Sequence, residues 1–119
     1  MATFQSSIIN KDRLRHGPSA IALLNTNFVL IDASTNWLNL FGFKVNEING
    51  KNWFAIFPDL SADWKIRLEH TLYGVQDIKI LDKVTLKDGT IKHFIWRLDP
   101  WKDSDGKHHG IVIRVVNPQ

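Results

Sequence analysis

The sequence contains no cysteine, which excludes disulfide bonds, thiolate catalysis and cysteine-ligated metal ions. It also lacks a secretory signal and any long apolar run, so we expect that this chain has no membrane-spanning segment. Because cysteine-free chains suit a reducing compartment, we expect a cytoplasmic location.

The chain also lacks the short motifs that usually mark an enzyme. Its glycines form neither G-x-G-x-x-G nor a phosphate-binding loop, and no serine lies in a G-x-S-x-G setting. No two histidines are four residues apart, so a zinc site on one helix face is not predicted. We therefore expect no catalytic residues, no bound metal ion and no enzymatic activity.

The composition is that of one globular domain, with 119 residues of which 44% are hydrophobic and 23% charged. The net charge is +3 and the pI is about 9.3, which alone would suggest nucleic acid. The lysines and arginines are interleaved with acidic residues, so they indicate a solvated surface and no nucleic-acid partner. A nucleic-acid binder stays a hypothesis that requires arginine and lysine gathered on one face.

The C-terminal third, from Lys83 to Val116, predicts three antiparallel strands. Asp88-Gly89 is a strong hairpin signal, because glycine readily adopts the positive φ that a tight turn needs. The stretch from Asp103 to Gly106 predicts a second, longer turn. Large apolar residues alternate with mixed ones in the middle strand, which gives that strand one apolar face. The apolar positions are Phe94, Trp96 and Leu98.

The N-terminal part predicts one short helix and one hairpin. Residues 2–16 predict a helix that Gly17-Pro18 stops and that docks on the domain or on a second copy. Residues 20–24 and 28–31 predict two strands joined by a tight turn.

Two further helices are predicted between these strands and the C-terminal ones. Ser34 is a good N-cap for a helix over 35–41, and Gly42 is a natural stop. Ser61 is predicted to cap a longer helix over 62–73. The order of elements is two strands, several short helices and three strands. It predicts an α+β fold with one five-stranded antiparallel sheet whose single face is covered by short helices.

Aromatic residues supply the main candidate site. Five tryptophans and seven phenylalanines are many for this length, and such residues line apolar ligand cavities. They also fill ordinary packed cores, and that alternative stays open. Trp101 follows Pro100 at a predicted strand end, so we expect it partly exposed at a dimer or effector surface. The candidate ligand-binding residues are Trp37, Phe41, Trp53, Phe54, Trp64, Leu68 and Trp96.

Several short motifs occur in an order that resembles one known family. They are Ser34 with Trp37-Leu38 and Phe41-Gly42, then Ile48 to Gly50 with Phe57-Pro58, then Trp64-Lys65 with Leu72 to Gly74, and finally Asp88-Gly89, Trp96, Pro100-Trp101, Asp105-Gly106 and Gly110. This set resembles the PAS domain, a small sensor module of bacterial signalling proteins. The resemblance covers about Pro18 to Val116, nearly the whole chain.

The resemblance implies a function and a domain plan. Such a domain binds a small ligand or a partner and relays a conformational change to an effector domain of the same parent chain, of histidine kinase or diguanylate cyclase type. It often forms a homodimer through an N-terminal helix. The implied segments are an N-terminal helix or linker over 1–17, the sensor domain over 18–116 and a truncated linker over 117–119.

The resemblance also bears on cofactors. The photoactive flavin branch of the family needs a cysteine for its adduct, so the lack of cysteine excludes that chemistry. A heme-binding member takes its axial histidine from the long-helix region, where His70 lies. The alternative for His70 is an ordinary polar helix residue, and we expect that alternative. The identity of any ligand stays open.

A second class of function is a small enzyme or carrier with a similar cone-shaped α+β cavity. It would require a carboxylate or histidine in the pocket whose pKa is shifted. The sequence points to no such residue.

Overall fold

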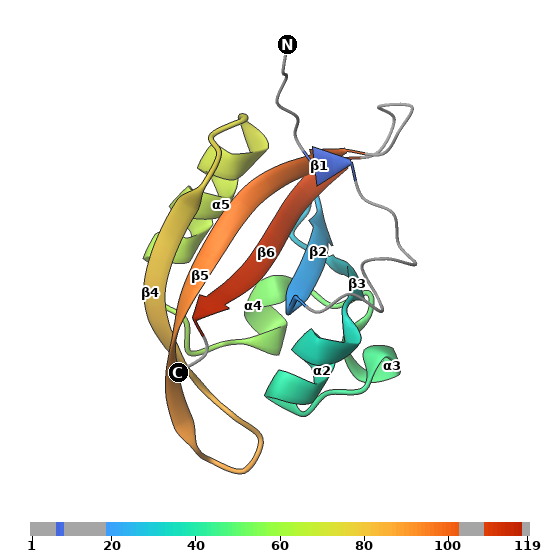
Figure 1. The fold of residues 1–119 in the computed structure, drawn as a ribbon, viewed down its shortest axis with the longest axis vertical. Helices are drawn as coiled ribbons and strands as arrows, with labels where there is room; N and C mark the ends of the chain where they lie inside the picture. The colour runs from blue at the N-terminus through green and yellow to red at the C-terminus, as the bar shows by residue number, and fades with distance from the viewer. Residues whose placement is uncertain (1–6, 9–18, 103–108, 118–119) are drawn as a thin grey trace.

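The computed structural model describes residues 7–8, 19–102 and 109–117. One sheet forms the body of the molecule, and its antiparallel part has the strand order β3-β2-β6-β5-β4 (Figure 1). The expected five-stranded antiparallel sheet is therefore confirmed. Its strands are β2 (Ile21–Asn25), β3 (Leu30–Ala33), β4 (Ile78–Thr85), β5 (Ile91–Lys102) and β6 (His109–Asn117).

Four short helices connect β3 to β4 and pack on one face of the sheet (Figure 1). The expected α+β class is thus confirmed. None of the helices in the described part of the chain has the length and apolar character that a bilayer span requires. The helices are α2 (Thr35–Phe41), α3 (Val45–Ile48), α4 (Trp53–Ile56) and α5 (Asp63–Leu72).

The N-terminal segment departs from the sequence prediction. Ser7–Ile8 forms a two-residue strand, β1, which pairs in parallel with Trp101–Lys102 at the end of β5. The predicted helix over 2–16 is therefore wrong at these two residues, and the rest of it lies outside the described residues. The exposed edge of β5 beyond β4 offers unpaired backbone groups, and an extended segment can satisfy them where a helix cannot.

The β4–β5 hairpin forms as predicted. Gly89 adopts a φ of 88° and its N–H donates to the Leu86 carbonyl, while the Asp88 carboxylate accepts the Thr90 N–H. The predicted turn at 103–106 lies outside the described residues. The alternation in β5 is confirmed, because Phe94, Trp96 and Leu98 are buried on the helix-covered face.

Ser34 caps α2 as predicted, and it also joins α2 to β2. Its hydroxyl oxygen accepts the Trp37 N–H at 3.1 Å and the Ile21 N–H at 3.0 Å. The hydroxyl donates to the Ser19 carbonyl at 2.8 Å. Gly42 ends the helix with a φ of 76°, the left-handed conformation that glycine adopts without strain. One buried side chain therefore sets both where α2 begins and where it lies against the sheet.

Ser61 does not cap α5, so that prediction is wrong. The helix begins at Asp63, its N-cap position is Ala62, and no side chain caps it. The Ser61 backbone N–H instead donates to the Asp82 carboxylate of β4 at 3.0 Å. This bond to a distant strand fixes the backbone just before α5.

Trp101 is buried, which contradicts the expected exposure at a dimer or effector surface. Strand β5 continues through it, so its ring lies on the face of the sheet opposite the helices, against Leu23 and Val112. Its indole N–H donates to the Leu24 carbonyl at 3.0 Å. A Cβ on Gly110 would lie 1.9 Å from that same carbonyl oxygen, so only glycine fits beside this bond.

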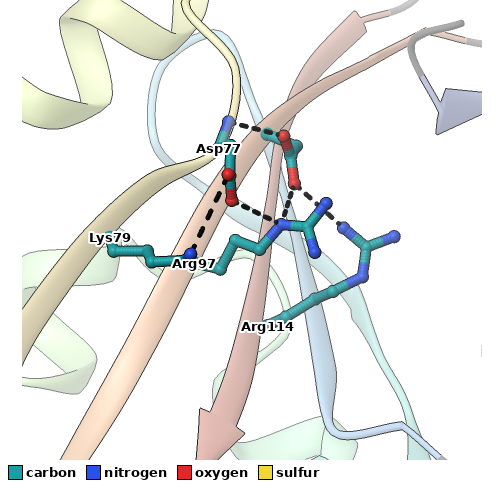
Figure 2. A network of polar contacts seen from close by, with 5 residues as sticks. Asp77, Lys79, Arg97 and Arg114 are labelled. Carbon is teal, nitrogen blue, oxygen red and sulfur yellow. Dashed lines mark hydrogen bonds and ion pairs between the residues drawn. The ribbon is translucent and has the colours of Figure 1, made fainter. Parts of the chain in front are cut away.

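A charged network occupies the outer face of β4, β5 and β6 (Figure 2). Asp99 is buried, and its carboxylate accepts from Arg97 Nε at 2.9 Å, from Arg114 Nη1 at 3.3 Å and from the Asp77 N–H at 2.8 Å. Arg97 also pairs with the more exposed Asp77, which in turn lies 3.9 Å from Lys79. Burial lowers the pKa of Arg114, and Asp99 opposes that shift. Asp99 thus holds two strands and the approach to β4 together.

We predict that Ser34→Ala lowers the free energy of unfolding by about 1–3 kcal/mol, because it removes an N-cap and leaves buried backbone groups unpaired. Urea denaturation of the purified chain measures this loss. Ser61→Ala is the matched control and should cost no more than about 0.5 kcal/mol, because its exposed hydroxyl caps no helix and makes only a solvent-accessible hydrogen bond to Asp82. Equal losses in the two variants would contradict the assignment.

We predict that Asp99→Asn lowers the free energy of unfolding by about 2 kcal/mol, because half-buried Arg114 then lacks a compensating charge. Asp77→Asn should change it by less than about 1 kcal/mol, since the Asp77 carboxylate is largely exposed and its ion pairs are screened. Urea denaturation of both variants tests the ranking. A larger effect at Asp77 would show that Asp99 is not the centre of the network.

Candidate functional site

The predicted ligand-binding residues come from three helices and one strand that meet over the middle of the sheet. Helix α2 contributes two, α4 two and α5 two, and β5 contributes the seventh. All are fully or nearly fully buried except Phe54, which is half-buried. The tertiary structure therefore gathers these residues in one region. In chain order they are Trp37, Phe41, Trp53, Phe54, Trp64, Leu68 and Trp96.

Trp96 lies at the centre of the ring contacts. Phe41 stacks on it with a centroid distance of 5.6 Å and an interplanar angle of 9°. Trp64 and Trp53 meet it edge to face at 5.2 and 5.9 Å. Trp37 completes the group through Trp53, at 6.2 Å, and Phe41, at 4.7 Å. These spacings are those of favourable aromatic pairs in direct contact. We call these five residues, together with three phenylalanines that contact them, the aromatic core. The three are Phe43, Phe57 and Phe94.

The aromatic core differs in two ways from the predicted set. Phe54 packs edge to face with Phe28 at 6.3 Å, at the margin of the group. Phe57, Phe43 and Phe94, which the prediction did not include, contact its central rings. Phe57 belongs to the dense apolar run at the end of α4, and Phe94 shares the inner face of β5 with Trp96. Both patterns were visible in the sequence.

The four tryptophans of the aromatic core differ in how their indole N–H groups are paired. Trp64 Nε1 donates to the Asp82 carboxylate at 2.8 Å. Trp96 Nε1 donates to the backbone carbonyl of Asp82 at 3.4 Å. The indole nitrogens of Trp37 and Trp53 are buried and have no hydrogen-bond partner among the residues that the structure describes.

Asp82 links α5 to the edge strand β4. Burial alone would raise the pKa of its carboxyl group, but hydrogen bonds from the Ser61 and Lys83 backbone and from the Trp64 indole outweigh burial and hold the pKa below its ordinary value of 3.8. Asp82 therefore remains ionised at neutral pH and acts as a fixed acceptor. It is a structural anchor at the rim of the aromatic core.

An open groove of about 670 Å³ lies away from the aromatic core, and none of the seven predicted residues lines it. It runs between α2 and the C-terminal end of β6, from Arg114, the residue that pairs with the start of β2, to Val116. Its two cations, Arg97 and Arg114, are the ones that Asp99 neutralises. The groove is lined by Ser19, Ala20, Asn36, Asn39, Leu40, Arg97, Arg114, Val115 and Val116.

His70 lies on the exposed side of α5, turned away from buried Trp64 and Leu68. In this position its imidazole does not face the aromatic core, so the geometry gives no support to an axial ligand for heme. Within residues 7–8, 19–102 and 109–117, no group of three histidine, aspartate or glutamate side chains is arranged to hold a metal ion.

We predict that Asp82→Asn lowers the free energy of unfolding by about 1 kcal/mol near pH 7. Because the folded-state pKa of Asp82 is lowered, its contribution is present above the ordinary value of 3.8 and is lost as the pH falls through the folded-state value. The difference between wild type and variant should therefore shrink toward pH ~3. Urea denaturation at several pH values measures it.

The control for this titration is Asp59→Asn, which removes a negative charge from an exposed position. It corrects for the general effect of net charge on acid stability. A wild-type advantage over Asp82→Asn that stays constant from neutral pH to about pH 3 would contradict the role of the ionised carboxylate.

Among solved structures, the VqmA dimer of Vibrio cholerae in the absence of target DNA is similar to this chain, with a TM-score of 0.71 and 20% identity over 91% of this chain and 51% of VqmA. VqmA bound to DPO has a TM-score of 0.71 and 20% identity over 89% of this chain and 55% of that one. The PAS domain of an HTR-like protein from Haloarcula marismortui has a TM-score of 0.69 and 12% identity, over 90% and 92% of the two chains.

At these identities the structural likeness shows the fold alone. The chain spans about half the length of the VqmA structures that it matches. No curated protein matches its sequence. The family model described as the PAS fold matches residues 14–118, which confirms the resemblance indicated by the motifs. The chain therefore belongs to the PAS family.

Proposed function

We propose that this chain is a sensory module that binds a small ligand within its aromatic core and relays the change in packing to an effector domain of its parent protein. Its mechanism is differential binding: the ligand stabilises one arrangement of the helices on the sheet over another. The module itself performs no catalysis in this proposal.

One observation carries the proposal: Trp37, Trp53, Trp64 and Trp96 converge from three helices and the central part of β5. The helices that bring three of these rings are short, with seven residues in α2 and four in α4. Short helices owe their stability to packing rather than to their own hydrogen bonds. A ligand that displaces or reorders the rings would therefore shift α2 and α4 on the sheet.

Two polar contacts offer routes from the aromatic core to the rest of the domain. Asp82 connects Trp64 with β4, and Ser34 connects the start of α2 with β2. A change in the position of α2 or α5 strains one of these bonds. Strand β2 pairs with the C-terminal strand β6, so such strain reaches the last strand of the sheet.

The proposal also covers the type of effector domain in the parent protein. The motif resemblance favours a histidine kinase or diguanylate cyclase. The likeness to VqmA, whose dimer has a target DNA, adds a DNA-binding regulator as a second class. We further propose a homodimer, since Leu81 and Val116 are exposed apolar residues beyond the core.

The alternative of a small enzyme or carrier finds less support in the geometry. Asp82 and Glu47 are carboxylates at the border of the aromatic core, and the pKa of each is lowered by hydrogen bonds. A general base or acid that works near neutral pH needs a pKa shifted upward instead. Asp82 therefore has the character of an anchor.

Native mass spectrometry tests the proposal. We expect the folded chain to carry an additional mass that is lost on denaturation. Phe41→Leu should reduce the bound fraction, because it changes the ring that stacks on Trp96. Leu81→Ala, at an exposed position on β4, should leave it unchanged. A bare dimer that gains no mass from a cell extract would instead indicate a dimerisation module with an ordinary packed core.

A further inference from the structure

The two unpaired indole groups define a chemical requirement inside the proposed site. Trp37 and Trp53 are both fully buried, and their rings lie 6.2 Å apart between α2 and α4. Each presents one N–H donor and no acceptor. A buried donor without a partner costs about 1–3 kcal/mol, and such groups in a native structure call for an explanation.

The other tryptophans show that the fold can pair such groups. Trp64 and Trp96 belong to the same aromatic core, and both direct their N–H groups to oxygens of Asp82. The two unpaired donors of Trp37 and Trp53 therefore both lie on the α2–α4 side of the core. On the α5–β4 side, the indole N–H groups are already used in hydrogen bonds that hold the fold together.

An ordered water molecule is a poor partner for these two donors. Buried water generally makes about three hydrogen bonds, and it donates as well as accepts. The aromatic core offers the indole N–H groups as donors, while its ring faces and edges are weak acceptors at best. A group that only accepts hydrogen bonds, such as a ketone, ester, ether or ring nitrogen, has no hydrogen to leave unpaired.

The charged groups around the core further limit the class of ligand that it can bind. The cation nearest to the printed ring contacts, Lys87 at 5.2 Å from the centroid of the Phe43 ring, is already paired with Glu47 at 3.0 Å. A carboxylate or phosphate placed among the rings would therefore be buried without a free counter-charge from the described residues. Asp82 at the rim remains ionised and repels anions. A ligand cation would find that same carboxylate already committed to Trp64 and to the Ser61 N–H.

We infer that the α2–α4 side of the aromatic core binds a neutral, mainly apolar or aromatic small molecule through acceptor atoms that pair with the indole N–H groups of Trp37 and Trp53. This inference rests on the proposed ligand-binding function and specifies the chemistry of that site. Trp37 and Trp53 supply orientation, and the surrounding rings supply apolar contact.

The test uses a pair of probes that share size and shape. Acetophenone carries a carbonyl acceptor, and α-methylstyrene has a methylene group in its place. Titration of the ¹⁵N-labelled chain is followed by the indole N–H signals in two-dimensional NMR, assigned by single tryptophan replacements. We expect acetophenone to move the Trp37 and Trp53 signals downfield and to bind about a hundredfold more tightly than α-methylstyrene, the effect of two hydrogen bonds of about tenfold each.

Variants that lack a single N–H group locate the contact. Replacement of Trp37 or Trp53 by 3-benzothienylalanine keeps the ring shape and removes the donor, and each should weaken acetophenone about tenfold. The same replacement of Trp101 is the matched control, because Trp101 lies on the opposite face of the sheet and its N–H is paired with the Leu24 carbonyl. It should leave the affinity within about twofold while it lowers stability. A second pair, Trp37→Phe and Trp101→Phe, checks the ranking genetically.

The outcomes separate this inference from the proposed function. Equal binding of both probes, with no effect of the Trp37 and Trp53 replacements, overturns the inference but leaves a ligand site in the core. A native ligand that lacks any acceptor atom overturns it in the same way. Failure of both probes to bind overturns the inference, and a folded chain that also takes up no mass from a cell extract overturns the proposed function as well.

Discussion

The packing of Trp96 against the helices is the interaction on which the rest of the structure depends. Its ring is fully buried on the inner face of β5 and contacts Phe41 of α2, Trp53 of α4 and Trp64 of α5. A side chain of this size removes a large apolar area from water, and its contacts join elements that are distant in the chain. Without these contacts, short helices such as α4 would lack the packing that keeps them folded.

Two aspartates complement this apolar centre from opposite faces of the sheet. Asp82 fastens α5 to the edge strand β4 through the Trp64 indole, and Asp99 holds Arg97 and Arg114 across β5 and β6. Each is a multiple acceptor for groups that burial would otherwise leave unpaired. The sheet is therefore held by apolar contacts on its inner face and by a charged network on its outer face. The unpaired donors of Trp37 and Trp53 stand out against this general saturation.

The fold was predictable because its signals are local. The alternation of Phe94, Trp96 and Leu98, the turn at Gly89 and the cap at Ser34 each depend on a few neighbouring residues, and each is confirmed. The predictions that failed depend on partners distant in the chain. The Ser61 N–H bonds to Asp82 and its hydroxyl does not cap α5, and the Trp101 indole bonds to the Leu24 carbonyl instead of facing solvent. Sequence spacing carries no information about such partners.

The candidate site shows the same division between features that local sequence predicts and features that distant partners decide. The sequence by itself determined that large aromatic residues fall at the buried positions of α2, α4, α5 and β5, because periodicity and side-chain size decide which faces leave water. Only the tertiary structure decided which indole N–H groups find an acceptor. Pairing depends on where Asp82 lies relative to Trp64, 18 residues away in the chain, and on the fact that no described residue places an acceptor within hydrogen-bond reach of the Trp37 and Trp53 indole nitrogens. Hydrogen bonds are directional and short, whereas burial needs only proximity, so the apolar content of the site could be read from the sequence and its polar specificity could not.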